Sequence, residues 1–243
     1  MASEFTFIVN KTCPICKNST RVVKLKAKLP VVSVDEDFCS HYKKGFNPYY
    51  YHIWVCEHCG FAGDEKNFLA VMPKKHQEKI RKVLEEKKVK FVFMEERQMP
   101  DAVASYRLAR LFAELRDMSL YQQAGIYLRI AWLYRFSEEK DMEMEYMRKA
   151  VDMYERSRLS ELYPQGNMTE YDLLYLIAAI HYRMNHFEES KKYISKLMAY
   201  TELRRLAPKA YDSTKKLLES IREQEKEKEK NNKTAGRNVY KRR

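Results

Sequence analysis

Two short cysteine motifs, Cys13-Pro14-Ile15-Cys16 and Cys56-Glu57-His58-Cys59-Gly60, decide the fold of the N-terminal part of this chain. In each motif the two cysteines lie three positions apart, so a tight turn can direct both thiolates at one ion. Gly60 follows the second pair, where a left-handed turn is usual. Two such knuckles supply a closed tetrahedral zinc site. The predicted ligands are Cys13, Cys16, Cys56 and Cys59.

The two pairs are separated by 39 residues, which is longer than in compact zinc ribbons. We therefore expect an insertion at about residues 25–49. Redox chemistry of the CxxC pairs and an iron–sulfur cluster are the alternatives to structural zinc. Cys39 and His41 form a Cys-x-His pair that could replace one ligand. A buried thiol and a surface imidazole are the simpler interpretation of these two residues, because four better-placed cysteines exist.

Two segments between the knuckles have the composition of β-strands, Val31–Val34 and Tyr50–Val55. In the second segment a strand would place Tyr51, Ile53 and Val55 on one face. Exposed aromatic rings beside lysines could stack on the bases of single-stranded nucleic acid, or could simply cover the core of the module. The candidate nucleic-acid or partner contacts are Lys43, Lys44, Tyr50, His52 and Trp54.

The rest of the chain predicts helices. A lysine-rich helix follows Pro73 and extends to about residue 88. Six further helices are expected over about residues 101–116, 119–136, 139–157, 169–185, 187–200 and 208–229. Ser119 with Gln122 forms a capping box, and Thr169 with Asp172 caps a helix in a similar way. Asn185 suits the left-handed residue that ends a helix.

An internal repeat with an offset of 47 residues runs through these helices. Ile130, Ala131, Tyr134, Met147 and Ala150 correspond to Ile177, Ala178, His181, Ile194 and Leu197. The tetratricopeptide (TPR) repeat has a period of 34 residues and a small residue where its two helices approach closely. The additional 13 residues fit a loop at about 157–169. A TPR-like array is therefore predicted, and a plain helical bundle with a chance coincidence is the alternative.

The chain has 243 residues and a net charge of +12, and the excess positive charge is concentrated in two places. Residues 74–90 contain eight lysines and arginines against three glutamates, a net +5. Residues 222–243 contain nine against four, again a net +5. The basic character therefore belongs to a connector and a tail, which predicts weak, non-specific binding of nucleic acid. The alternating Glu-Lys sequence of the tail predicts a frayed, disordered segment.

Several function classes lack support in this sequence. It contains no P-loop, no G-x-G-x-x-G, no G-x-S-x-G and no H-E-x-x-H motif, and so we expect no enzyme. The N-terminus does not read as a signal peptide, and no segment has about 18 uninterrupted apolar residues. We therefore expect a cytoplasmic protein without a membrane partner. Five cysteines in such a chain favour metal binding over disulfides.

The chain resembles a known family. The resemblance is carried by the first knuckle, Asp37-Phe38, the stretch Gly45–Tyr51, and Trp54-Val55-Cys56 with Cys59-Gly60-Phe61-Ala62 and Phe68. The family is widespread in Firmicutes and is catalogued as a domain of unknown function. It is similar in plan, with paired CxxC knuckles followed by TPR-like helices. The resemblance covers about residues 10–215 and implies a cytoplasmic bacterial protein. It brings no established activity.

Together these features predict an α+β, mainly α chain. A small zinc-ribbon-like β module is expected at residues 1–72, a basic helical connector at 73–99, an all-α TPR-like domain at 100–221 and a disordered tail at 222–243. The predicted function is that of a non-catalytic zinc protein whose helices bind a protein or peptide partner. The alternative is a nucleic-acid-binding protein that uses the zinc module and the basic segments.

Overall fold

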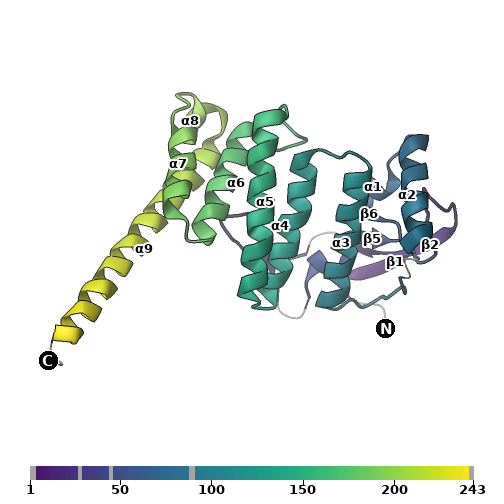
Figure 1. Cartoon of the computed structure of the whole chain (residues 1–243), viewed down its shortest axis with the longest axis horizontal. Helices are drawn as coiled ribbons and strands as arrows, with labels where there is room; N and C mark the ends of the chain where they lie inside the picture. Colours follow the sequence, from purple (N-terminus) through teal and green to yellow (C-terminus); the bar gives the residue numbers. More distant parts are fainter. Residues whose placement is uncertain (1–3, 27–28, 44–45, 88–90, 241–243) are drawn as a thin grey trace. The chain divides into compact units, whose positions relative to one another are not determined.

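A computed structural model describes residues 4–26, 29–43, 46–87 and 91–240 of the chain. The molecule divides into two compact units. The first contains residues up to Asp35 and Cys39–Glu161, and the second contains Glu36–Phe38 together with the chain from Leu162 onward. Figure 1 shows both units and labels most of their helices and strands. The predicted fold class is confirmed, because small antiparallel strand pairs near the N-terminus precede a chain that is mainly helical.

Within the described residues, the strands of the first unit form three two-stranded antiparallel sheets. The β1–β2 pair and the β5–β6 pair each have a cysteine knuckle at the turn between the strands. The β3–β4 pair belongs to the insertion that separates the knuckles in the sequence. The strands are β1 (Thr6–Thr12), β2 (Ser19–Leu25), β3 (Val31–Val34), β4 (Ser40–Tyr42), β5 (Ile53–Val55) and β6 (Ala62–Asp64).

The sequence prediction for Tyr50–Val55 is partly wrong. Residues Pro48–Tyr51 form the 3-10 helix η1, and only Ile53–Val55 are extended. Asn47 starts η1, since its side chain accepts a hydrogen bond from the Tyr49 N–H and Pro48 supplies a fixed φ at the first position. Tyr51 therefore does not share a strand face with Ile53. The β1–β2 hairpin was not predicted, because its seven-residue strands carry lysine, arginine and threonine at many positions.

The helices of the first unit are η1 (Pro48–Tyr51), α1 (Glu65–Leu69), α2 (Lys74–Lys87), α3 (Met99–Leu115), α4 (Leu120–Phe136) and α5 (Lys140–Ser160). Helix α3 packs against both the β part and α4. Its Tyr106 is fully buried and donates to the Tyr49 carbonyl at 3.2 Å, and its Phe112 ring lies 5.2 Å from the ring of Phe61. These contacts give the β part and the helices one continuous core.

The second unit contains α6 (Glu170–Arg183), α7 (Phe187–Met198), α8 (Leu203–Leu206) and α9 (Pro208–Tyr240). The short segment Glu36–Phe38 packs on α6, with the Phe38 ring 5.5 Å from Tyr175 and Glu36 3.3 Å from the Arg183 guanidinium. As predicted, the Thr169 hydroxyl and the Asp172 carboxylate cap α6 reciprocally.

Helix α9 continues through the segment for which the sequence predicts a disordered tail. Two contacts hold the first part of that segment. Gln224 donates to the Tyr182 hydroxyl at 2.8 Å, and Glu225 pairs with Lys191 of α7 at 2.6 Å. The alternating charges of the tail therefore include partners on neighbouring helices, which a search for pairs within one helix does not reveal.

The offset of 47 residues is visible in the backbone. Helices α4 and α5 are joined by a three-residue turn in which Glu138 has φ +61°, and α6 and α7 are joined by a turn of the same length in which Asn185 has φ +61°. The N–H of Glu138 bonds to the Arg135 carbonyl at 3.1 Å, and the N–H of Asn185 bonds to the Tyr182 carbonyl at 2.9 Å. The two helical hairpins therefore repeat the same turn.

The side chains at the repeated positions are buried in both hairpins. Ala131 and Ala178 are fully buried, which allows the two helices of each pair to approach closely. The Ser190 hydroxyl of α7 donates to the Ala178 carbonyl at 2.8 Å and so links the two helices of the second hairpin. The other repeated residues are at most 7% exposed.

Among the helices that the structure describes, none combines the length with the apolar character that crossing a membrane requires.

Candidate metal centre

The two cysteine knuckles have the same backbone hydrogen bonds. In the first, the Cys13 N–H donates to the Asn18 carbonyl at 2.9 Å and the Lys17 N–H donates to the Cys13 carbonyl at 3.1 Å. In the second, the Cys56 N–H donates to Phe61 and the Gly60 N–H donates to Cys56, both at 2.8 Å. Each turn thus positions two cysteines three residues apart at the end of a hairpin.

Both knuckles turn through a left-handed residue directly after the second cysteine. Gly60 has φ +80°, as predicted, and Lys17 has φ +66° at the equivalent position. Glycine adopts this conformation without steric cost, whereas lysine does so at a cost of roughly 1 kcal/mol. The Lys17 ammonium donates to the Pro14 carbonyl at 2.7 Å, a contact that helps to hold the first turn.

The four cysteine sulfurs converge on one point. The Sγ atoms of Cys13 and Cys59 are 3.7 Å apart, those of Cys16 and Cys56 are also 3.7 Å apart, and all four lie within 4.8 Å of one another. Four sulfurs at 2.3 Å from a tetrahedral ion would be about 3.8 Å apart. The arrangement therefore fits a single metal ion. In an iron–sulfur cluster the four thiolates bind two or four different irons, which would hold at least some pairs of sulfurs farther apart.

The four sulfurs are not disulfide-bonded, because no disulfide joins any of the five cysteines, all of which lie in the described part of the chain. Hydrogen bonds from the thiols of Cys13 and Cys59 hold the pKa of Cys56 far below its ordinary value. The hydrogen bond to Cys56 in turn raises the pKa of Cys13 to about 12, and the bonds to Cys13 and Cys56 raise the pKa of Cys59. In the absence of a metal, these hydrogen bonds thus favour a thiolate at Cys56 and protonated thiols at Cys13 and Cys59. A bound cation would replace those protons, which makes metal affinity depend on pH.

Polar contacts around the sulfurs connect the β1–β2 hairpin to the β5–β6 hairpin. The Thr20 hydroxyl, fully buried in β2, accepts from the Glu57 N–H of the second knuckle at 3.1 Å. Arg21 pairs with the Glu57 carboxylate at 2.6 Å, and an imidazole nitrogen of His58 lies 2.9 Å from the Ser19 carbonyl. From α2, Arg81 donates to the Ile15 carbonyl at 3.2 Å. These polar contacts orient the knuckles from outside the sulfur cluster.

A family-level comparison identifies the group of proteins to which the chain belongs. The chain belongs to the DUF2225 family. The matching family model is described as an uncharacterized protein conserved in bacteria and covers residues 9–228. The match spans the metal centre, both helical hairpins of this DUF2225 chain and most of α9. No curated protein and no solved structure matches it.

Cys39 and His41 of this DUF2225 chain lie in a second group of potential ligands, apart from the four cysteines. The ligand atoms of Asp35, Cys39 and His41 are within 4.8 Å of one another. An imidazole nitrogen of His41 is 2.9 Å from the Asp35 carboxylate, which also pairs with the Arg135 guanidinium at 2.7 Å. Arg135 in turn binds Glu143 at 2.6 Å. A cation bound here would compete with Arg135 for Asp35, so the network is best described as an ion-paired bridge between the insertion and α4–α5.

The predicted contact residues do not share one exposed surface. Trp54 is 3% exposed and packs edge-on against Phe68 at 5.9 Å, so its ring belongs to the core of the DUF2225 module. His52 and Tyr50 are partly buried, and the His52 ring lies against Tyr49 at 5.2 Å. Lys43 is exposed, and Lys44 lies outside the described residues. The geometry favours packing over base stacking for Trp54.

Sequence reasoning missed the residues that support the centre. Thr20, Arg21 and Arg81 carry no motif, because each acts through a partner at least 36 positions away. A signal for Thr20 exists only in the alternating burial of β2, in which Thr20 and Val22 are buried while Ser19 and Arg21 are exposed.

Proposed function

We propose that this chain is a non-catalytic zinc protein of the bacterial cytoplasm whose helical hairpins bind a protein or peptide partner. The observation that carries the proposal is the closed set of four cysteine sulfurs within 4.8 Å of one another. Four thiolates fill the coordination sphere of Zn²⁺, so no open position remains for a substrate or a reactive water. The role of the zinc is to cross-link the β1–β2 and β5–β6 hairpins.

The helical hairpins supply the interaction part of the proposal. TPR-like arrays place small residues between paired helices and offer the surface of the first helix of each pair to an extended peptide. The repeated turns at Glu138 and Asn185 and the buried Ala131 and Ala178 support a TPR-like interpretation of α4–α5 and α6–α7. In this interpretation each hairpin binds through exposed residues of its own first helix, which is α4 in the first unit and α6 in the second.

Site-specific photo-crosslinking in the native bacterium tests this proposal. A photoreactive phenylalanine analogue replaces Tyr127 on α4 or Tyr171 on α6, both of which are partly exposed. The control carries the same group at Lys82, which is exposed on α2. The proposal expects the same partner from the α4 or α6 position and none from Lys82. Equal labelling of all three positions, or no protein adduct at α4 and α6, would refute an interaction through the hairpins.

A further inference from the structure

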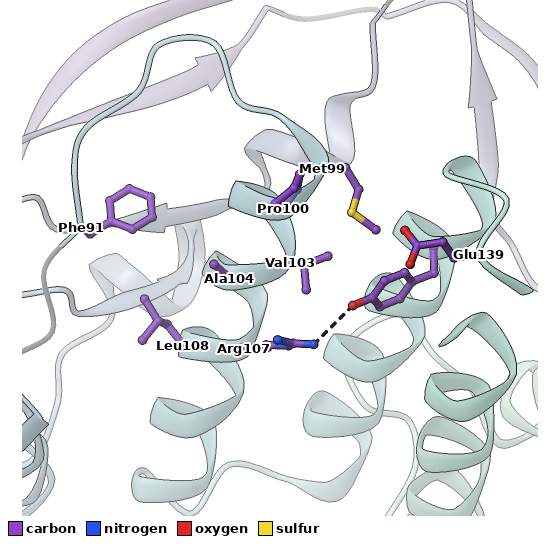
Figure 2. A pocket seen from close by; sticks show the side chains of 9 residues that line it. Phe91, Met99, Pro100, Val103, Ala104, Arg107, Leu108 and Glu139 are labelled. Carbon is purple, nitrogen blue, oxygen red and sulfur yellow. Dashed lines mark hydrogen bonds between the residues drawn. The ribbon is translucent and has the colours of Figure 1, made fainter. Parts of the chain in front are cut away.

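The first unit contains a pocket of about 600 Å³ that opens beside α3. Its wall is mainly apolar and includes Phe91, Val103 and Leu108, whereas its polar groups are Arg107, Tyr134 and Glu139. In the view of Figure 2, Phe91 and Leu108 lie to one side of Arg107 and Glu139 lies to the other. Pockets of this size with an apolar wall and a few converging polar groups suit a small ligand or one apolar side chain with its flanking groups.

Arg107 is the positive charge of this pocket, and no carboxylate of the described residues lies within ion-pair distance of its guanidinium. Its Nη2 donates to the Tyr134 hydroxyl and its Nε donates to the Tyr146 hydroxyl, both at 3.3 Å. The two tyrosine rings stack with their centroids 5.5 Å apart, which fixes both hydroxyls. A guanidinium has five N–H donors, so three remain for a ligand. The Tyr134 hydroxyl accepts from Arg107 and keeps its own proton for donation.

Glu139 limits the number of negative charges that a ligand of this pocket can carry. Its carboxylate accepts a hydrogen bond from the Ser137 hydroxyl at 3.0 Å and is exposed at the edge of the pocket. It forms no side-chain cap on α5, although it stands at the N-cap position. One anionic group of a ligand can therefore face Arg107, while a second anionic group near Glu139 would be repelled.

We propose that this pocket binds an apolar carboxylic acid. The carboxylate accepts hydrogen bonds from Arg107 and Tyr134, and the apolar group lies against Phe91, Val103 and Leu108. Guanidinium and carboxylate form paired, charge-assisted hydrogen bonds, which favours a carboxylate over a neutral amide of the same shape. Such a group occurs in a free small acid and also at the C-terminal residue of a peptide. This inference does not depend on the partner binding proposed for the helical hairpins.

Calorimetric titration of the full chain distinguishes these sources. The free-acid probe is 4-phenylbutyrate, with 4-phenylbutyramide as its neutral match. The peptide probe is an acetylated pentapeptide that ends in phenylalanine, with a free or an amidated C-terminus. A preference of about tenfold or more for one carboxylate probe over its amide supports the proposal. The probe pair that shows this preference identifies the ligand as a free acid or as a peptide C-terminus. Equal binding of acid and amide, or no binding of either pair, overturns it.

Substitutions then locate the binding. Arg107→Gln should weaken binding of the carboxylate probe about tenfold or more, and Glu139→Gln should strengthen it a few-fold by removing a negative charge. The matched control is Arg110→Gln on the same helix, where Arg110 pairs with Glu114 outside the pocket.

A second test fills the pocket, because Arg107→Gln also removes two hydrogen bonds within the protein. In Ala104→Phe a larger ring occupies the space, since Ala104 is exposed in the pocket. Equal losses in Arg107→Gln and Arg110→Gln, or unchanged binding in Ala104→Phe, would contradict the proposed location.

Discussion

The guanidinium of Arg97 donates a hydrogen bond to the backbone carbonyl of Ile53 at 2.6 Å, and this bond connects the segment before α3 to the start of β5. The same Nη1 atom reaches the Tyr50 carbonyl at 3.1 Å. Arg97 is 5% exposed, and burial lowers its pKa to about 10. The buried guanidinium thus supplies donors to one carbonyl within η1 and to the first carbonyl of β5.

Replacing Arg97 should destabilise the first unit. Arg97→Met leaves the carbonyls of Tyr50 and Ile53 without donors, and we expect the free energy of unfolding to fall by about 2–4 kcal/mol. The loss is partly offset because a buried charge disappears. Arg97→Lys should cost less, since an ammonium can still reach one carbonyl. Urea denaturation with the m-value checked in each variant measures both changes. A Met variant as stable as the wild type would show that these bonds contribute little.

The metal prediction concerns content and identity. Protein purified without chelator should contain one zinc per chain, measured by elemental analysis. Cys13→Ser or Cys59→Ser should lose the metal, because three thiolates and a hydroxyl bind zinc far more weakly. Cys39→Ser is the matched control, since Cys39 is buried in the separate Asp35–His41 group and should leave the zinc content unchanged. Zinc loss in the Cys39 variant would mean that the ligand set is different.

Removal of one ligand should unfold part of the molecule. In Cys56→Ser the two knuckles are no longer cross-linked, and zinc contributes on the order of 10 kcal/mol to folding such modules. The effect should spread to α3, because Tyr106 and Phe112 pack on the module. Limited proteolysis should therefore cut the region before α4 early and leave α6–α9 protected. Equal digestion of both units would show that they do not fold independently.

The stability of the first unit should fall in mild acid because of His52. Burial and the nearby charge of Arg129 lower the pKa of His52 from 6.5 to about 4. Between these values the unfolded chain binds the proton and the folded chain does not, so stability is complete above pH 6.5 and decreases as pH falls towards 4. From pH 7.5 to pH 5 the loss should be at most about 2 kcal/mol.

The variant His52→Phe isolates the contribution of His52 to the loss of stability in acid. It keeps an aromatic contact with Tyr49 and leaves all four cysteine ligands, so acid release of the metal affects both proteins equally. Denaturation at pH 7.5 and pH 5 should show a smaller acid loss in the variant. The same pH dependence in both proteins would mean that another group controls acid stability.

Binding of nucleic acid should be weak and dependent on salt. Residues 231–243 contain five lysines and arginines and no acidic residue, whereas Gln224, Glu225 and Lys228 contact α6 and α7. Truncation after Lys230 should therefore reduce oligonucleotide affinity at about 150 mM salt and lower the salt slope, because fewer counterions are released. The triple change Lys74→Gln, Lys75→Gln and Lys82→Gln on exposed positions of α2 should act in the same direction.

A different result would identify a specific nucleic-acid site. Tight binding that survives the truncation and is lost in Tyr50→Ala would move recognition to the aromatic residues of the module. Trp54 is unsuitable for this test, because its buried ring supports the core and its removal would unfold the module.

Local sequence determined much of the architecture. The spacing within Cys13–Cys16 and Cys56–Gly60 predicted two turns of one geometry, because a CxxC turn is defined by its own backbone hydrogen bonds. Most of the longer helices followed from apolar periodicity, whereas α1 and α8 were not predicted. Thr169 with Asp172 fixed the start of α6 because a capping box involves neighbours only. Asn185 likewise adopted the predicted left-handed turn.

Only the tertiary structure decided the features that depend on distant partners. The convergence of four sulfurs within 4.8 Å requires two hairpins separated by an insertion to meet. Tyr50 and Tyr51 adopt a 3-10 helix although their residue types favour strands, because Asn47 and Arg97 bind the backbone around them. Arg107 stands beside the Tyr134 and Tyr146 hydroxyls only because α3 packs against α4–α5. Propensity and spacing act over a few residues, whereas the environment of a side chain depends on contacts that chain folding brings together from far along the sequence.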